Sequence, residues 1–266
     1  MHGETEGTCG GGDSESLKTV DVGSSSDVGR VREDNQDYFG MFPEDDIDLS
    51  SPKGQLFIVA DGMGGHKAGR EASELAVNLV AYYYHSVPED DIPQSLTRAL
   101  EGANRHIHSY SENDPRLAGM GTTCVALALQ GNRAYIGHIG DSRVYRINRL
   151  KVTQLTHDHS KVAEMVRRRI LTKEEARTHP QRSHLYRALG TRSEAEFDII
   201  ENITLKTDDY FLMCTDGLYN HVSDREMKSI VLANVPVFAC RELVALANER
   251  GGTDNITVQV IHAYGG

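Results

Sequence analysis

Four aspartates stand out because their neighbours place them where chemistry is possible. Asp61 follows the apolar run LFIVA and precedes a glycine-rich turn, and Asp216 follows YFLMCT and precedes a glycine. Asp254 follows two glycines at the entrance to an apolar run, and Asp37 closes RVREDNQD before two aromatic residues. Glycine lets the backbone approach an ion and offer a carbonyl oxygen. One Asp before Gly would indicate only a turn, but four carboxylates in such surroundings together indicate a site.

Carboxylates at the ends of several strands meet at one rim of a sheet, where their mutual repulsion is costly unless cations neutralise it. Oxygen ligands without nearby His or Cys clusters favour the hard ions Mg²⁺ or Mn²⁺ over zinc. A purely structural Ca²⁺ site is the alternative, but the sequence has no EF-hand loop and the candidate ligands lie far apart in it. The residues therefore predict a metal site built from oxygen ligands.

Short strands and paired helices must position these aspartates. Apolar runs between turn signals predict strands at 55–60, 122–129, 134–139, 143–147, 151–155, 197–205, 210–214 and 256–263. Periodicity predicts helices at 68–85, 92–111, 224–233 and 237–250, the second with one face made by Ile92, Leu96, Leu100, Ala103 and Ile107. Strict βαβ alternation is missing, which favours stacked antiparallel sheets flanked by helix pairs over a parallel sheet.

Composition excludes several classes of protein. The chain has 266 residues with 28 Lys and Arg against 39 Asp and Glu, a net charge of -11, which argues against a nucleic-acid binder. No apolar run approaches the roughly 18 residues of a membrane span, and no signal-peptide pattern begins the chain, so we expect a cytoplasmic protein. The four cysteines are far apart without a CxxC pair, which indicates reduced thiols.

The first 16 residues differ in composition from the rest. They are rich in Gly, Ser, Thr and acid and have no aliphatic residue after Met1. Such a segment cannot bury enough surface to offset its ordering entropy, so we expect a disordered tail at 1–16. We expect 17–266 to form a single catalytic domain, because no linker or internal repeat divides it.

Eight short motifs follow one another along the chain: VREDNQD at 31–37, VADGMGGH at 59–66, GTT at 121–123, GDSR at 140–143, LTHDHS at 155–160, RALG at 187–190, CTDGL at 214–218 and GGTDNITV at 251–258. Each alone is weak evidence, but in order and spacing the set resembles the metal-dependent protein phosphatases, the protein phosphatase 2C family, in its compact bacterial form. The resemblance extends from about residue 19 to the end. The resemblance implies an α+β fold, a four-layer αββα sandwich of two antiparallel sheets flanked by helix pairs, with a flap at about 160–187.

The resemblance also assigns roles. Asp61 matches the carboxylate that bridges two metal ions, and the carbonyl of Gly62 matches a ligand of one of them. The remaining matches to metal ligands are Asp216 and Asp254 for the first ion, Asp37 for the second, and Asp141 together with Asp216 for a looser third ion. Arg32 matches the arginine that binds the substrate phosphate. Asn255, Asp158 and Thr122 match scaffold positions whose parts the sequence does not resolve.

These roles imply a Mn²⁺- or Mg²⁺-dependent enzyme that hydrolyses phosphoserine and phosphothreonine in proteins in a single step, by attack of a water or hydroxide that bridges the ions. The same resemblance implies a Ser/Thr protein kinase as functional opponent, and we expect a monomer. A catalytically silent relative that acts as a binding module is the alternative. Such relatives usually lose metal carboxylates, whereas Asp37, Asp61, Asp216 and Asp254 are all present here.

Two departures from the family pattern concern the site. Met63 stands where eukaryotic members carry a His proposed as general acid, so that role cannot be carried over; His66 or a metal-bound water are the alternatives. Gln36 stands where many members have Glu, which leaves Asp37 as the better ligand. His157 and His159 flank Asp158 on an extended segment, so they point away from it, and we expect structural roles for both histidines.

The segment 161–187 is the most basic part of the chain. It carries eight Lys and Arg against three Glu, a balance of +5, which leaves -16 on the remainder. A solvated charged helix would explain this nearly as well as a flap that steers acidic phosphopeptides. If the flap does steer them, reversing Arg167, Arg168 and Arg169 to Glu lowers kcat/KM for acidic peptides and spares p-nitrophenyl phosphate.

Overall fold

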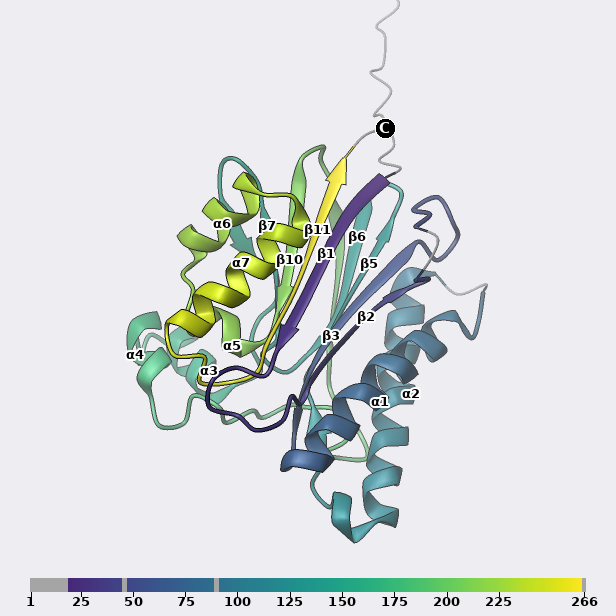
Figure 1. Ribbon diagram of the computed structural model, residues 1–266. Helices are drawn as coiled ribbons and strands as arrows, with labels where there is room; N and C mark the ends of the chain where they lie inside the picture. The colour runs from purple at the N-terminus through teal and green to yellow at the C-terminus, as the bar shows by residue number, and fades with distance from the viewer. Residues whose placement is uncertain (1–18, 45–46, 89–90, 265–266) are drawn as a thin grey trace, which may run out of the picture.

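The computed structural model describes residues 19–44, 47–88 and 91–264. The expected disordered tail at 1–16 lies outside these residues. Figure 1 shows two sheets side by side, with one helix pair on each outer side. All strand pairs are antiparallel. The described residues therefore form the four-layer αββα sandwich that the sequence predicts.

The first sheet has the strand order β1 (Thr19–Asp27), β11 (Ile256–Tyr264), β10 (Asp209–Cys214), β7 (Arg143–Ile147) and β8 (Val152–Gln154). The second sheet has the order β2 (Asp37–Phe42), β3 (Gln55–Met63), β5 (Cys124–Gln130), β6 (Arg133–Ile139) and β9 (Asp198–Thr204). The short strand β4 (Gly121–Thr122) pairs with the end of β3.

Helices α1 (His66–His85) and α2 (Ile92–Asn113) cover the second sheet, and α6 (Asp224–Ala233) and α7 (Pro236–Glu249) cover the first. A short 3-10 helix (Pro115–Leu117) follows α2, and α5 (Asp216–Tyr219) follows β10. The flap contributes α3 (Lys161–Arg167) and α4 (Lys173–Thr178), which lie near α5 at one end of the sandwich (Figure 1). No helix in the described ranges is both long and apolar enough to cross a membrane.

Three hydrophobic clusters correspond to the three interfaces between the four layers. One packs α1 and α2 on the second sheet, one packs α6 and α7 on the first, and the third lies between the sheets. The predicted face of α2 is buried, with each of its five residues at most 3% exposed. Helical periodicity therefore located the contact face of this helix correctly, because only one stripe of an amphipathic helix can face the core.

All eight predicted strands are present, the second of them divided between β4 and β5, and all four predicted helices are present within a few residues of their predicted ends. Strands β1 and β2 were not predicted. β1 reads TVDVGSSSD and β2 reads DYFGMF, and both are edge strands. β1 has two apolar residues in nine, so its apolar signal is weak, whereas β2 is largely apolar but short and interrupted by Gly40.

The cysteines of the described residues are reduced, as the sequence indicates. Cys124, Cys214 and Cys240 are free and buried. Burial raises the pKa of Cys124 and of Cys240 to about 12. These thiols are therefore protonated, and they pack as small apolar groups.

Candidate active site

The site begins where β2 and β3 pair. The register places Asp37 directly opposite Asp61, so the two carboxylates come from neighbouring strands at the same level of the second sheet. The carbonyl of Asp61 accepts hydrogen bonds from the Thr122 hydroxyl and from the Thr123 backbone N–H, both at 2.9 Å. Thr122, whose part the sequence left open, therefore fixes the backbone at Asp61.

The first sheet contributes the other carboxylates. Asp216 begins α5 directly after β10, and Asp254 lies two residues before β11, the strand that pairs with β10. Asp141 lies between β6 and β7, where the chain crosses from one sheet to the other. The five aspartates thus collect at the end of the sandwich where both sheets meet.

Two glycines let backbone segments approach each other at this end. A Cβ atom on Gly62 would lie 1.9 Å from the carbonyl oxygen of Gly69, and a Cβ atom on Gly217 would lie 1.9 Å from the carbonyl oxygen of Asn255. Both distances are far below van der Waals contact. The glycines after Asp61 and Asp216 are therefore required by packing, in addition to any part of the Gly62 carbonyl in metal binding.

The electrostatics of the cluster are those of crowded acids. Burial, followed by repulsion from neighbouring carboxylates, raises the pKa of Asp61 and of Asp141 well above the usual value. Burial also raises the pKa of Asp37 to about 7, although Thr215 donates a hydrogen bond to its Oδ2 at 2.9 Å. Burial and the charge of Asp254 raise the pKa of Asp216 to about 6.

The cluster has the properties of a site for divalent cations. The Oδ1 atom of Asp37 is buried without a hydrogen-bond partner. Arg143 lowers the pKa of Asp141 and of Asp216, but burial and carboxylate repulsion outweigh it, so both pKa values remain raised. Unpaired buried carboxylates are costly, and a hard divalent ion with oxygen ligands removes that cost. The donor set therefore fits Mn²⁺ or Mg²⁺.

Arg32 lies at the exposed side of the cluster. Its guanidinium is half exposed and donates to Asp254 Oδ2 at 2.8 Å. The loop that carries it is fixed by Asn255, whose amide donates to the carbonyls of Val28 and Asp34 at 2.9 Å each. The Asn255 side-chain oxygen also accepts the backbone N–H of Gln36 at 2.8 Å. Asn255, whose part the sequence left open, therefore holds the loop between β1 and β2.

Asp158 holds an arginine of the GDSR motif. Its carboxylate accepts two hydrogen bonds from Arg143, at 2.6 and 2.9 Å, and the Arg143 guanidinium stacks 3.4 Å from the ring centre of Tyr219. The Tyr219 hydroxyl donates to the carbonyl of Asp141 at 3.1 Å. Asp158 therefore positions the Asp141 segment indirectly, through Arg143 and the tyrosine.

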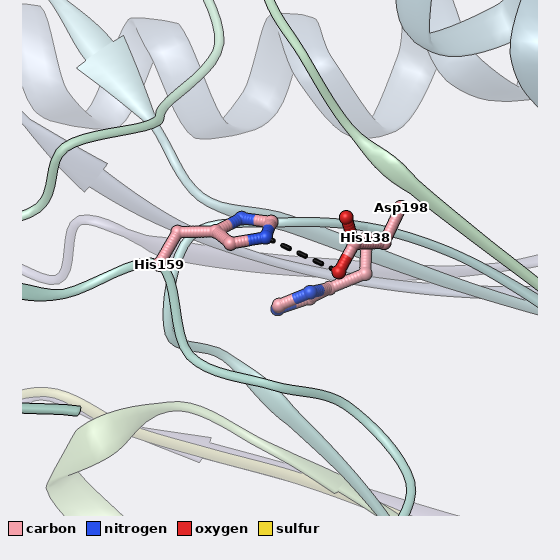
Figure 2. Close-up of side chains that lie close together, drawn as sticks. All are labelled: His138, His159 and Asp198. Atoms are coloured by element: carbon pink, nitrogen blue, oxygen red, sulfur yellow. Dashed lines mark hydrogen bonds and ion pairs between the residues drawn. The ribbon is translucent and has the colours of Figure 1, made fainter. Parts of the chain in front are cut away.

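A histidine cluster lies beside the flap and was not predicted. Figure 2 shows His159 directed at Asp198 and the ring of His138 close by. The His159 Nε2 atom lies 3.3 Å from Asp198 Oδ2. Burial lowers the pKa of His138 to about 3, and neither of its ring nitrogens has a hydrogen-bond partner. The sequence contained one indication of this cluster: His138 is a polar residue inside the apolar run AYIGHI.

This histidine cluster resembles a metal site only in its spacing, since three possible ligand atoms lie within 4.8 Å of one another. The backbone N–H of Gly140 donates to His159 Nδ1 at 3.1 Å, so the ring proton must be on Nε2. A protonated Nε2 has no lone pair for a metal. Arg187, 3.2 Å from that atom, adds a competing cation. We therefore assign the cluster a structural part, which agrees with the expectation for His159.

Two further histidines, His157 and His66, were considered in the sequence analysis. His157 is exposed and belongs to the flap side of the site. The side chain of His66 is outside the described residues, so its suggested part as general acid stays a prediction. Met63 pairs with Gly121 at the end of β3 and carries no proton to donate.

Comparisons with known proteins agree with this geometry. The family described as protein phosphatase 2C matches residues 32–250. The serine/threonine phosphatase stp of Listeria monocytogenes is 37% identical over 241 residues, which are 89% of this chain and 93% of that protein.

Solved structures give the same result. The serine/threonine phosphatase PstP/Ppp of Mycobacterium tuberculosis superposes with a TM-score of 0.79 at 35% identity, over 92% of this chain and 99% of that one. A PstP catalytic domain in complex with two manganese ions gives a TM-score of 0.78 at 33% identity, over 92% and 98% of the two chains. The motifs, the sandwich and these relatives agree, and the chain belongs to the protein phosphatase 2C family.

Proposed function

We propose that this chain is a Mn²⁺- or Mg²⁺-dependent protein phosphatase that hydrolyses phosphoserine and phosphothreonine in proteins. The supporting observation is the convergence of five aspartates from both sheets, one of which is bonded to the half-exposed guanidinium of Arg32. The family relatives carry names of serine/threonine phosphatases, and one was solved with two manganese ions.

In this proposal, Asp61 would hold both ions, and the Gly62 carbonyl would hold one of them. Asp216 and Asp254 complete the first ion site, and Asp37 belongs to the second. Bound ions would supply charge neutralisation for the phosphate dianion and activation of water for its hydrolysis. The aspartates hold those ions, and their raised pKa values mean that the ions displace protons on binding.

Arg32 binds the substrate phosphate in this proposal. A guanidinium offers two parallel N–H donors that match two phosphate oxygens. Its present partner, Asp254, is a proposed metal ligand. Arg32 is therefore placed beside the ions without being buried among them, and Asn255 fixes the loop that carries it.

Asp141 is proposed to hold a third, looser ion together with Asp216. It is buried, and repulsion from Asp216 contributes to its raised pKa. Asp141→Ala should then leave the two core ions bound and shift the Mn²⁺ dependence of turnover. Identical Mn²⁺ titrations for this variant and the parent would reject the third-ion role.

A catalytically silent binding module is the second candidate, and no observation favours it, because all five carboxylates are retained. The physiological setting is also part of the proposal: a single catalytic domain at 17–266, a monomeric state, a cytoplasmic location and a Ser/Thr kinase as opponent.

The test is turnover of p-nitrophenyl phosphate and of a phosphothreonine peptide by the purified chain with Mn²⁺. We expect hydrolysis of both and its loss on addition of chelator, restored by excess Mn²⁺. Undiminished activity in excess EDTA would contradict the metal-dependent function. Inactivity with every divalent ion tested would favour the silent module.

A further inference from the structure

A cavity of about 600 Å³ lies between the carboxylates and the flap. Asp141 and Asp216 line it from the site, and Arg177 and Arg182 line it from the flap. A substrate whose phosphate lies at the aspartates therefore has space on this side for the residues next to the phosphorylated one. The cavity has the size of a pocket for a few side chains.

The cations that line this cavity divide into paired and unpaired groups. Arg143 is bonded to Asp158, Arg167 to Glu164, and Arg187 to Asp198 and Glu196. Arg177 and Arg182, by contrast, are exposed and form no ion pair or side-chain hydrogen bond with any described residue. Two guanidinium groups in the cavity are thus free to bind a ligand.

Free guanidinium groups in such a place select for anions. Arginine presents a planar fork of donors that matches a carboxylate or a phosphate. The rest of the chain is strongly acidic, since 161–187 carries +5 within a total of -11. Long-range attraction of acidic substrates is therefore poor, and local contacts to the flap must supply any preference for them.

We propose that Arg177 and Arg182 form a binding subsite for an anionic group of the substrate protein, a carboxylate or a second phosphate, next to the phosphoresidue that is hydrolysed. This inference rests on the proposed phosphatase function and names its substrate class.

The proposed subsite differs from the one expected from the basic sequence alone. Arg167 and Arg168 are both bonded to Glu164, and neither Arg168 nor Arg169 lines the cavity. The segment KVAEMVRRR is the most basic cluster in the sequence, but two of its arginines share the single carboxylate of Glu164. The pair that remains free comes from α4 and the turn after it.

The experiment measures kcat/KM for a set of phosphothreonine peptides with the full chain and Mn²⁺. One peptide is neutral around the phosphothreonine. The others carry a Glu, or a second phosphothreonine, at one flanking position at a time. The Glu peptides and the doubly phosphorylated peptides separate the two sources of negative charge, and p-nitrophenyl phosphate reports the chemistry without any flanking group.

We expect the parent chain to prefer one position of the anionic group by about three- to tenfold, mostly through KM, since an exposed charge-assisted contact is modest. Arg177→Gln and Arg182→Gln should each reduce this preference, and the double variant should abolish it. Activity on the neutral peptide and on p-nitrophenyl phosphate should not change. Raised salt should weaken the preference in the parent alone.

Arg168→Gln is the matched control, because it removes one flap charge outside the cavity. An equal loss of preference in Arg168→Gln would overturn the subsite, since it would indicate a general charge effect. A parent that hydrolyses p-nitrophenyl phosphate but treats all peptides alike would also overturn it. A parent inactive on p-nitrophenyl phosphate would contradict the phosphatase function itself, which separates the two failures.

Discussion

The carboxylate rim, formed by Asp37, Asp61, Asp141, Asp216 and Asp254, and the flap at 160–187 lie next to each other but are held in different ways. The rim is positioned by strand pairing: Asp37 lies opposite Asp61 in a six-residue register, and Asp216 and Asp254 adjoin two strands that pair with each other. The flap is positioned by short helices, isolated bridges such as Ser160 with Leu185, and partly exposed ion pairs. Backbone hydrogen bonds between strands give the rim the fixed geometry that catalysis requires. Residues of the flap can be substituted without disturbing the sheets.

Removal of one rim carboxylate is the strongest way to separate function from stability. Asp61→Asn should lower kcat/KM for p-nitrophenyl phosphate by more than about 100-fold, because even residues that only support metal ligands cost 10- to 100-fold. In chelator the same variant should melt at a higher temperature than the parent, because repulsion among the rim carboxylates falls. Activity assays and thermal melts measure the two effects.

Both the loss of activity and the raised melting temperature are needed to conclude that the rim holds the metal and that its carboxylates repel one another without it. Wild-type turnover in Asp61→Asn would show that the rim is not the metal site. A lower melting temperature in chelator would show that the carboxylates do not repel one another in the folded chain. Glu71→Gln is a control that should change neither quantity, because Glu71 lies on helix α1 and forms an ion pair with Lys67 on the same helix.

Substitution of Arg32 tests the exposed side of the rim. Arg32→Ala should raise KM for phosphopeptides by about 10- to 100-fold, as expected for the loss of hydrogen bonds to a charged group worth about 1.5–3 kcal/mol. Arg32→Lys should recover part of this loss, because the charge remains and the fork is lost. A KM that is unchanged in Arg32→Ala would reject phosphate binding by this residue.

The pH dependence of stability in chelator distinguishes the rim from the rest of the chain. Burial raises the pKa of Asp37 to about 7, against about 4 in the unfolded chain. Between these values the folded chain binds more protons than the unfolded chain, so the contribution of Asp37 to the free energy of unfolding falls as pH rises from 4 to 7. Burial lowers the pKa of His138 to about 3, so the contribution of His138 to the free energy of unfolding rises with pH up to about pH 6.5.

The comparison that isolates Asp37 is therefore between the parent and Asp37→Asn, which share His138. We expect the melting temperature of the variant to rise relative to the parent as pH increases from 5 to 8. A constant difference across this range would contradict the raised pKa of Asp37.

The smallest expected effect concerns the flap backbone. Arg169 follows α3 with φ of 59°, a left-handed conformation that favours glycine. Arg169→Gly should stabilise the flap by about 0.5–1 kcal/mol, seen as slower amide exchange in α3. Arg168→Gly, at a residue with φ of -78°, should have the opposite effect. Equal exchange rates in all three chains would contradict strain at Arg169.

The sequence by itself determined the family, the layers and the members of the rim. The motifs that contain Asp61, Asp216 and Asp254 combine an apolar strand, a carboxylate and glycine, and each of these features is local in the chain. The helix pairs and eight strands followed from periodicity for the same reason. Edge strand β1 was missed because it carries little apolar signal, and edge strand β2 was missed because its apolar run is short and contains a glycine.

Only the tertiary structure decided which charges are free and which are paired. Arg32 lies on Asp254, 222 residues away, and Asn255 holds a loop more than 200 residues earlier. His138 and Asp198 pair on neighbouring strands, and His159 reaches them from the loop after β8. Arg167 and Arg168 share Glu164, whereas Arg177 and Arg182 form no ion pair with any described residue. Long-range pairing of polar groups has no periodicity in sequence, because each pair depends on the distance between side chains after folding and not on spacing along the chain.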